Sequence, residues 1–101
     1  ENTVNYPCIK LDSSARQATA KDIELQMSPK EFDLLYFLAR HPNRVYSREQ
    51  LLENVWGYSY LGDPRTVDTH IRRIREKLQS VNNSQCIKTI WGRGYKFELA
   101  K

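Results

Sequence analysis

The sequence predicts a single α+β domain in which a small antiparallel sheet comes first, three helices follow and a β-hairpin ends the chain. Its 101 residues, 40% hydrophobic and 28% charged, match the usual size of one domain and leave no room for two cores. Polar and apolar residues alternate in short runs near both ends, which is typical of half-buried strands. Between them, two segments begin with a serine that is followed three residues later by Glu or Gln, a signature of helix N-termini.

Residues 1–26 are expected to form the antiparallel sheet, because their alternating pieces are separated by turn residues such as those at 12–14. The first helix should begin after Ser28, where a Pro occupies the first helical position and Glu31 can bond back to the cap. It should end at His41, because the residue before a Pro is disfavoured in the helical region.

A second, short amphipathic helix is expected over residues 48–56, with Ser47 as its cap and Gly57 as its C-terminal stop. Trp56 lies at helical spacing from other apolar residues, so it is expected to belong to the core. Residues 45–46 are long enough only for a bridging strand.

A third helix is expected over residues 65–79, capped by the preceding Asp-Pro pair. Its apolar side chains are spaced four, three and four residues apart and should form one narrow buried stripe: Val67, Ile71, Ile74 and Leu78. The side chains that should point away from the core are Arg65, Thr69, Arg72, Arg73 and Glu76. One flank of that face should carry Thr66, His70 and Lys77, and the other Asp68 and Arg75.

Two strands at 86–91 and 95–99 are expected to form a hairpin around a turn at 91–94, where two glycines supply positive φ values. Cys86 opens this hairpin, and the other cysteine, Cys8, is far away in the sequence. Without C-x-x-C spacing we expect no metal site, and we expect no cofactor. The two cysteines could pair, but buried thiols are the commoner state in apolar strands.

The charges are strongly polarised along the chain. Residues 1–64 carry seven Lys and Arg against nine Asp and Glu, whereas residues 65–101 carry nine against three. A basic cluster of this kind indicates a binder of polyanions, although a solvated basic face would give the same count. A helix held by charge pairs could use Asp68 with Arg72, or Arg72 with Glu76.

Two capped helices, an arginine-rich third helix and a hairpin with a basic tip follow the order of a winged helix-turn-helix. In such a fold Arg72 and Arg73 would read bases in the major groove, while Arg65 and Thr66 would meet phosphates. Arg93 at the hairpin tip could enter a minor groove or be a solvated turn residue. For Trp91, contact with DNA and packing on the domain body are both open.

An enzyme is not expected. His70 has no carboxylate or cysteine at catalytic spacing, and Ser47 and Ser59 have no base as partner in the sequence. The glycines at 92 and 94 are too few for a phosphate-binding loop, which would also need a following helix. The absence of an apolar membrane span or signal peptide leads us to expect a cytoplasmic protein.

Five segments together closely resemble the DNA-binding effector domain of OmpR/PhoB-type bacterial response regulators. The resemblance runs from about Tyr6 to Leu99. It is carried by residues 28–35, 45–52, 55–57, 65–75 and 92–97.

The resemblance implies a winged helix that follows a phosphorylatable receiver domain, so residues 1–5 are interpreted as a linker remnant. A sensor histidine kinase would phosphorylate the receiver in a two-component system, and the resulting homodimer would bind tandem direct repeats in promoter DNA to regulate transcription. By position, Arg73 and Arg75 resemble base-reading residues and Thr89 resembles a phosphate contact. Groove or backbone contacts are implied for Arg65, Thr66, His70 and Arg72.

Two features qualify the resemblance. At Trp91 the family often has a basic residue, so the minor-groove role could have passed to Arg93. The loop that contacts RNA polymerase in several members corresponds to Tyr58, Ser59, Tyr60, Leu61, Gly62 and Asp63.

Other winged helices are protein-interaction modules or bind nucleic acid without sequence preference, and this alternative function stays open.

Overall fold

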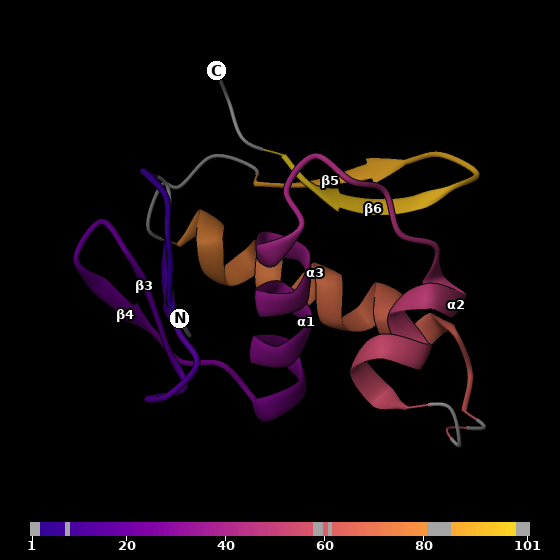
Figure 1. Ribbon diagram of the computed structural model, residues 1–101, viewed down its shortest axis with the longest axis horizontal. Coiled ribbons are helices and arrows are strands. Elements are labelled where there is room, and N and C mark those ends of the chain that lie inside the picture. Colours follow the sequence, from indigo (N-terminus) through magenta and orange to yellow (C-terminus); the bar gives the residue numbers. More distant parts are fainter. Residues whose placement is uncertain (1–2, 8, 58–59, 61, 81–85, 99–101) are drawn as a thin grey trace.

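The computed structural model describes residues 3–7, 9–57, 60, 62–80 and 86–98. Within them the strands, helices and final hairpin follow the predicted order, and the predicted α+β class is confirmed (Figure 1). The strands are β1 (Thr3–Asn5), β2 (Lys10–Asp12), β3 (Gln17–Ala20), β4 (Ile23–Leu25), β5 (Ile87–Ile90) and β6 (Gly94–Phe97). The helices are α1 (Pro29–Arg40), α2 (Arg48–Leu51) continued by the π-helix η1 (Leu52–Trp56), and α3 (Arg65–Gln79).

The N-terminal sheet is an antiparallel meander in the order β1-β2-β3-β4. Leu11 lies opposite Ala18, which in turn lies opposite Leu25, so one row of apolar side chains crosses the sheet and is buried. The predicted turn after β2 is confirmed, because an Asp12 carboxylate oxygen accepts hydrogen bonds from the N–H groups of Ser14 (3.0 Å) and Ala15 (3.3 Å).

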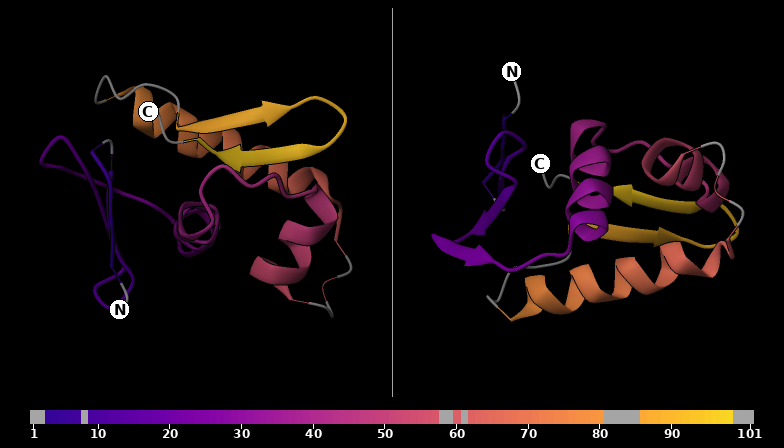
Figure 2. Two further views of the ribbon diagram at one scale, coloured as in Figure 1. Left: turned by 45° about the horizontal axis from the view of Figure 1, so that its top comes forward. Right: turned by 90° about the horizontal axis from the view of Figure 1, so that it is seen from below.

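Helix α1 begins and ends where the sequence predicts. The Ser28 hydroxyl accepts a hydrogen bond from the Glu31 N–H (3.3 Å), and the Glu31 carboxylate accepts one from the Ser28 N–H (3.0 Å), which completes a capping box. The helix ends at His41, whose N–H donates to the Leu38 carbonyl. Figure 2 shows α1 between the N-terminal sheet and the rest of the domain, and both of its sides therefore carry core residues.

The second helix spans the predicted residues but changes its winding half-way. Ser47 and Gln50 form the expected capping box, and Leu51 is fully buried. Beyond it, the Gly57 N–H reaches the carbonyl of Leu52 (2.8 Å), five residues back, which widens the last turn into η1. Trp56 is consequently only partly buried at the margin of the core, so the prediction that it is a core residue holds only in part.

Helix α3 buries the predicted stripe completely, because Val67, Ile71, Ile74 and Leu78 are all at most 2% exposed. Pro64 occupies its N-cap position and has no capping side chain. The Asp63 carboxylate instead accepts the Arg65 N–H (2.9 Å) from one residue farther out. The first turn is therefore capped by the predicted pair of residues.

Strands β5 and β6 form the C-terminal hairpin, which lies beside α3 (Figures 1 and 2). The predicted bridging strand is a single bridge, in which Tyr46 and Tyr95 exchange two backbone hydrogen bonds of 2.9 Å. Cys86 is buried, as predicted for a packed thiol, and Cys8 lies outside the described residues. No helix in the described ranges is long and apolar enough to cross a membrane.

Candidate nucleic-acid interface

The outward face of α3 presents exposed arginines. Arg72 and Arg73 are exposed, and neither forms an ion pair with any described residue. The charge pairs considered as an alternative, Asp68 with Arg72 and Arg72 with Glu76, do not form. The Asp68 side chain turns away from Arg72 and bonds to Arg48 and Tyr95 instead. These two guanidinium groups are therefore available to an external anion.

Arg65 is also exposed, but its charge is already compensated. Its guanidinium lies 2.7 Å from an Asp63 carboxylate oxygen, and its Nε donates to the same oxygen at 2.9 Å. This hydrogen bond lowers the pKa of Asp63 and raises that of Arg65. Nε and Nη2 of Arg65 are thus engaged by Asp63, and a phosphate that takes these donors would have to displace the carboxylate.

The flank of α3 that faces η1 is occupied by Thr66 and His70, both partly buried as predicted. His70 places Nδ1 2.7 Å from the Thr66 carbonyl oxygen, and its ring meets the Trp56 indole edge-on at 5.1 Å. The neighbouring Thr69 is also partly buried, and its hydroxyl donates to the Arg65 carbonyl (3.2 Å). His70 is thus held by its own helix and by η1, and Thr69 by its own helix.

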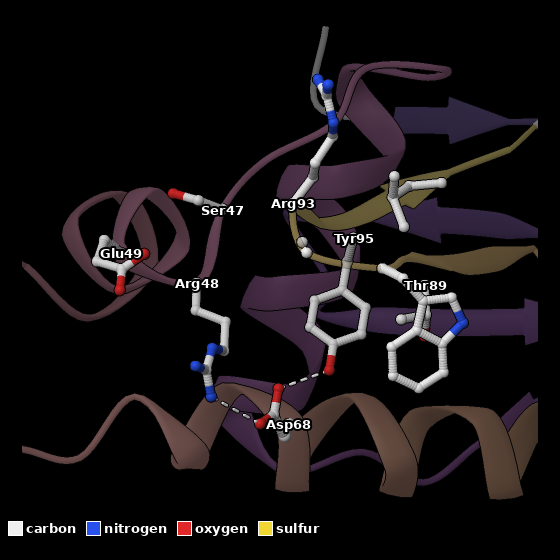
Figure 3. Close-up of a pocket in the computed structure, with 11 residues that line it drawn as sticks. Ser47, Arg48, Glu49, Asp68, Thr89, Arg93 and Tyr95 are labelled. Atoms are coloured by element: carbon white, nitrogen blue, oxygen red, sulfur yellow. Dashed lines mark hydrogen bonds and ion pairs between the residues drawn. The ribbon is translucent and has the colours of Figure 1, made fainter.

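The other flank of α3 is tied to the hairpin through Asp68. One carboxylate oxygen accepts a hydrogen bond from the Tyr95 hydroxyl (2.5 Å) and the other accepts one from an Arg48 Nη1 (3.0 Å), as Figure 3 shows. Burial of Tyr95, reinforced by this bond to a carboxylate, raises its pKa to about 12. A single side chain therefore connects α2, α3 and β6.

Arg75 makes the second connection between this flank and the hairpin. Its Nη2 donates to the Thr89 hydroxyl (2.7 Å) and to the Ile87 carbonyl (3.1 Å), and the guanidinium lies over the Tyr95 ring at 5.7 Å. The predicted flank position is confirmed. The base contact expected of Arg75 and the phosphate contact expected of Thr89 remain predictions, and the two side chains are paired with each other here.

A cleft of about 480 Å³ lies between the start of α2, the flank of α3 and the hairpin tip. Arg48, Asp68 and Tyr95 form its floor, and Arg93 at the tip points away from α3 (Figure 3). Among the described residues no cluster of three or more His, Cys, Asp or Glu side chains could hold a metal ion.

The hairpin tip is exposed and basic. Trp91 is 91% exposed, so it does not pack on the domain body, and its contact with DNA remains a prediction. Arg93 is exposed as well, and its backbone N–H closes the turn onto the Ile90 carbonyl (2.9 Å). Gly92 and Gly94 have φ values of 77° and 141°, as the tight turn requires.

The predicted polymerase loop is only partly within the described residues. Tyr58, Ser59 and Leu61 lie outside them, whereas Tyr60, Gly62 and Asp63 are exposed. The Tyr60 ring lies 6.3 Å from that of Trp56. An aromatic side chain is therefore displayed next to η1, away from the hairpin.

A family described as "Transcriptional regulatory protein, C terminal" matches residues 22–97. This chain belongs to that family. ResD of Bacillus subtilis, named a transcriptional regulatory protein, is 48% identical over 101 residues that cover 98% of this domain and 42% of ResD. The domain thus spans about two fifths of the length of this relative.

Solved structures agree with the assignment. Response regulator DrrB of Thermotoga maritima, described as an OmpR/PhoB homologue, superimposes with a TM-score of 0.85 at 36% identity, covering 98% of the domain and 45% of DrrB. The DNA-binding domain of Klebsiella pneumoniae RstA, solved in complex with the RstA box, gives 0.83 at 32% identity and covers 97% and 98%. The domain is a winged helix-turn-helix of the OmpR/PhoB type, and the predicted fold and family are confirmed.

Sequence reasoning missed the residues that hold the interface together. Tyr95 and Arg48 were not singled out, because contacts between separate elements leave no recognisable residue spacing in the sequence.

Lys77 forms an ion pair with the buried Glu31 of α1 and so joins α1 to α3. Burial alone would raise the pKa of Glu31, but the bonds from Lys77 and from the Ser28 N–H outweigh it and lower that pKa.

Proposed function

We propose that this domain binds duplex DNA sequence-specifically and regulates transcription as the output domain of a two-component response regulator. The observation that carries the proposal is the pair of exposed arginines on α3, Arg72 and Arg73, which have no acidic partner among the described residues. An α-helix fits the major groove, and an arginine there can donate two hydrogen bonds to guanine.

In this proposal α3 lies in the major groove and the tip at residues 91–94 lies near the adjacent minor groove. Arg73 reads a base edge, with Arg72 and Thr69 beside it on the groove. Arg65, Thr66 and His70 serve the groove wall or the backbone. They stand at the first turns of the helix, where its dipole favours a phosphate.

Arg75 and Thr89 can serve DNA only after a rearrangement. Arg75 would exchange the Ile87 carbonyl and the Thr89 hydroxyl for a base edge, and the hydroxyl so released would be free to meet a phosphate. The exchange replaces one carbonyl and one hydroxyl acceptor by the O6 and N7 acceptors of a guanine, so the number of hydrogen bonds of the guanidinium can be kept.

The larger protein is part of the same proposal. A relative more than twice as long supports a receiver domain before Glu1, phosphorylated by a sensor histidine kinase and forming a homodimer on tandem direct repeats. Such a regulator works on promoter DNA in the cytoplasm. Exposed Tyr60 supports an RNA polymerase contact for the loop at 58–63.

The experiment is selection from random duplexes, followed by dissociation constants for the selected and a scrambled site at several salt concentrations. We expect an enriched motif and a plot of log affinity against log salt with a slope of about −3 to −5 for three to five neutralised phosphates. Lys10→Ala is the control, because it removes an exposed cation from β2 in the N-terminal sheet and should leave the slope unchanged. No enrichment with a slope near zero would instead favour a protein-interaction module, and strong binding without enrichment a non-specific nucleic-acid binder.

A further inference from the structure

Helix α3 is attached to the core mainly by contacts that have little directionality. Its buried side chains are all aliphatic, namely Val67, Ile71, Ile74 and Leu78. Burial of apolar surface is favourable in any arrangement that excludes water, so a stripe of this kind tolerates small shifts and rotations of the helix. A hydrogen bond to a base edge does not, because it weakens steeply when its distance or angle is poor. Directional contacts are therefore needed to set the position of α3.

One directional contact comes from the first turn of α1, a helix that packs across α3 (Figure 1). The Glu31 carboxylate is buried and accepts a hydrogen bond from the Lys77 ammonium group, with which it also forms an ion pair. The same carboxylate oxygen accepts the Ser28 N–H (3.0 Å), which fixes the Glu31 side chain on its own helix. Among the described residues, the bond between Glu31 and Lys77 is the one side-chain hydrogen bond that joins α1 to α3.

The neighbouring Lys30 holds the preceding helix in a similar way. Its Nζ donates to the Val55 carbonyl of η1 (2.9 Å) and lies 5.9 Å from the centre of the Trp56 ring. Two consecutive residues of α1, Lys30 and Glu31, thus contact the two helices on either side of the loop at 57–64. The first turn of α1 is therefore a common support for both helices of the helix-turn-helix.

The other directional contacts of α3 are more open to exchange. The pair of Arg48 and Asp68 is partly exposed, and Arg75 would give up its hairpin partners for a base edge in the function proposed above. Glu31 is only 3% exposed, so an external group cannot readily reach its carboxylate. The contact with Glu31 is thus the one best suited to hold α3 while a duplex is bound.

We propose that Glu31 is a positioning residue for sequence recognition: through Lys77 it fixes the shift and rotation of α3, and so aims Arg73 at its base edge. Lys77 follows Arg73 by four residues, about one helical turn, so a displacement at one position is passed to the other. Fixing a register is the best-attested use of a buried ionic group. The inference rests on the proposed DNA binding and adds to it a residue that touches no DNA.

The main variant is Glu31→Gln, and its readout is the specificity ratio, the dissociation constant for a scrambled duplex divided by that for the selected duplex. The amide keeps the size of the side chain and an oxygen for the Ser28 N–H, but it removes the charge that faces Lys77. The specificity ratio should fall about tenfold, as for the loss of one bidentate base contact, while scrambled duplex is bound at least as well as by wild type. Glu24→Gln, at an exposed position of β4, is the matched charge control and should shift both constants equally.

Variants of Lys77 test whether Glu31 acts through this pair. Lys77→Gln should lower the specificity ratio, and combining it with Glu31→Gln should lower the ratio no further than either single change. Lys77→Arg keeps the charge and should retain most of the ratio. If Lys77 instead contacted a phosphate, Lys77→Gln would weaken both duplexes alike and make the salt slope shallower by about 0.9, which overturns the inference. The Lys77 side chain is 34% exposed, so these variants carry the test even if Glu31→Gln does not fold.

A variant of the same turn separates positioning from stability. Ser28→Ala removes the capping hydroxyl without changing a charge, so it should lower the urea midpoint of unfolding but keep the specificity ratio. If folded Glu31→Gln keeps the wild-type ratio, or if Ser28→Ala lowers the ratio as much, the inference is wrong while DNA binding by α3 stands. If wild type enriches no duplex, the proposed function fails and the inference fails with it.

Discussion

The outward face of α3 and its hairpin-side flank carry arginines in contrasting circumstances. Arg72 and Arg73 are exposed and unpaired among the described residues, whereas Arg75 is held by a carbonyl, a hydroxyl and an aromatic ring of the hairpin. Asp68 on the same flank is held by Arg48 and Tyr95. The difference teaches that α3 performs two tasks with similar residues: one face is left free for a ligand, and the flank fixes the hairpin relative to that face.

The buried stripe provides the largest contrast with the outward face. Ile74→Ala should lower the free energy of unfolding by about 2–5 kcal/mol, because it leaves a cavity at a fully buried position between α3 and the core. Arg73→Ala, the adjacent position, is the control and should change it by less than about 0.5 kcal/mol. Urea unfolding of both variants measures the difference. Equal losses would mean that the outward face is also structural.

Removal of the Asp68 charge should show how much the hairpin-side flank of α3 contributes to stability, compared with the outward face. Asp68→Asn keeps the size of the side chain but weakens its bonds to Tyr95 and Arg48, so unfolding should become easier by about 1–2 kcal/mol. The exposed half of this network contributes little, since the Arg48 pair is partly solvated. Arg72→Ala serves as the control on the outward face. If Asp68→Asn has no effect on stability, the Asp68 carboxylate does not help to hold the hairpin.

The pH dependence of stability tests the hydrogen bond between Tyr95 and Asp68 through the ionisation of Tyr95. The pKa of Tyr95 is raised to about 12 in the folded state from an ordinary value of 10.0, so folding favours its neutral form. Its contribution is therefore fully present below pH 10 and is lost as the pH rises from 10 to about 12. The difference in unfolding free energy between wild type and Tyr95→Phe, measured from pH 8 to 12, should shrink over this window. A difference that is constant with pH would contradict the raised pKa.

The fold could be predicted from the sequence because its signals are local. The capping boxes at Ser28 and Ser47 and the spacing of the α3 stripe, four, three and four residues, each depend on neighbours within one or two turns. The wider winding of η1 was not predictable in this way, because a capping box and apolar spacing are the same for an α-helical turn.

The candidate site was predicted less completely, because several of its contacts join residues that are far apart in the sequence. A helical wheel separates the outward face from the flanks, and it placed Arg75 beside Asp68 correctly. It contains no information about what lies opposite the flank, so the bonds from Arg75 to Thr89 and from Tyr95 to Asp68 were not foreseen. Contacts between residues 12 or more positions apart become visible only when the hairpin is packed on α3.

The smallest expected effect on DNA binding comes from the loop next to η1. Tyr60→Ala should leave the dissociation constant for the selected site within about threefold, because Tyr60 contacts Trp56 and not the outward face of α3. If the target promoter is activated, transcription from it should fall. Mobility shift and a reporter assay on the same variant give both values. A large loss of DNA affinity in a folded Tyr60→Ala protein would assign the loop to recognition instead.

The central claim is that Arg73 on the outward face of α3 reads sequence, while Arg93 at the hairpin tip and Arg65 at the helix start provide general affinity. The direct measurement is the dissociation constant of Arg73→Ala, Arg93→Ala and Arg65→Ala on the selected and on a scrambled duplex at fixed salt. Arg73→Ala should lose about 1–3 kcal/mol on the selected duplex and little on the scrambled one, whereas the other two variants should lose similar amounts on both. If Arg73→Ala weakens both duplexes equally while Arg93→Ala narrows the gap between them, the roles of helix and hairpin are reversed and the account is contradicted.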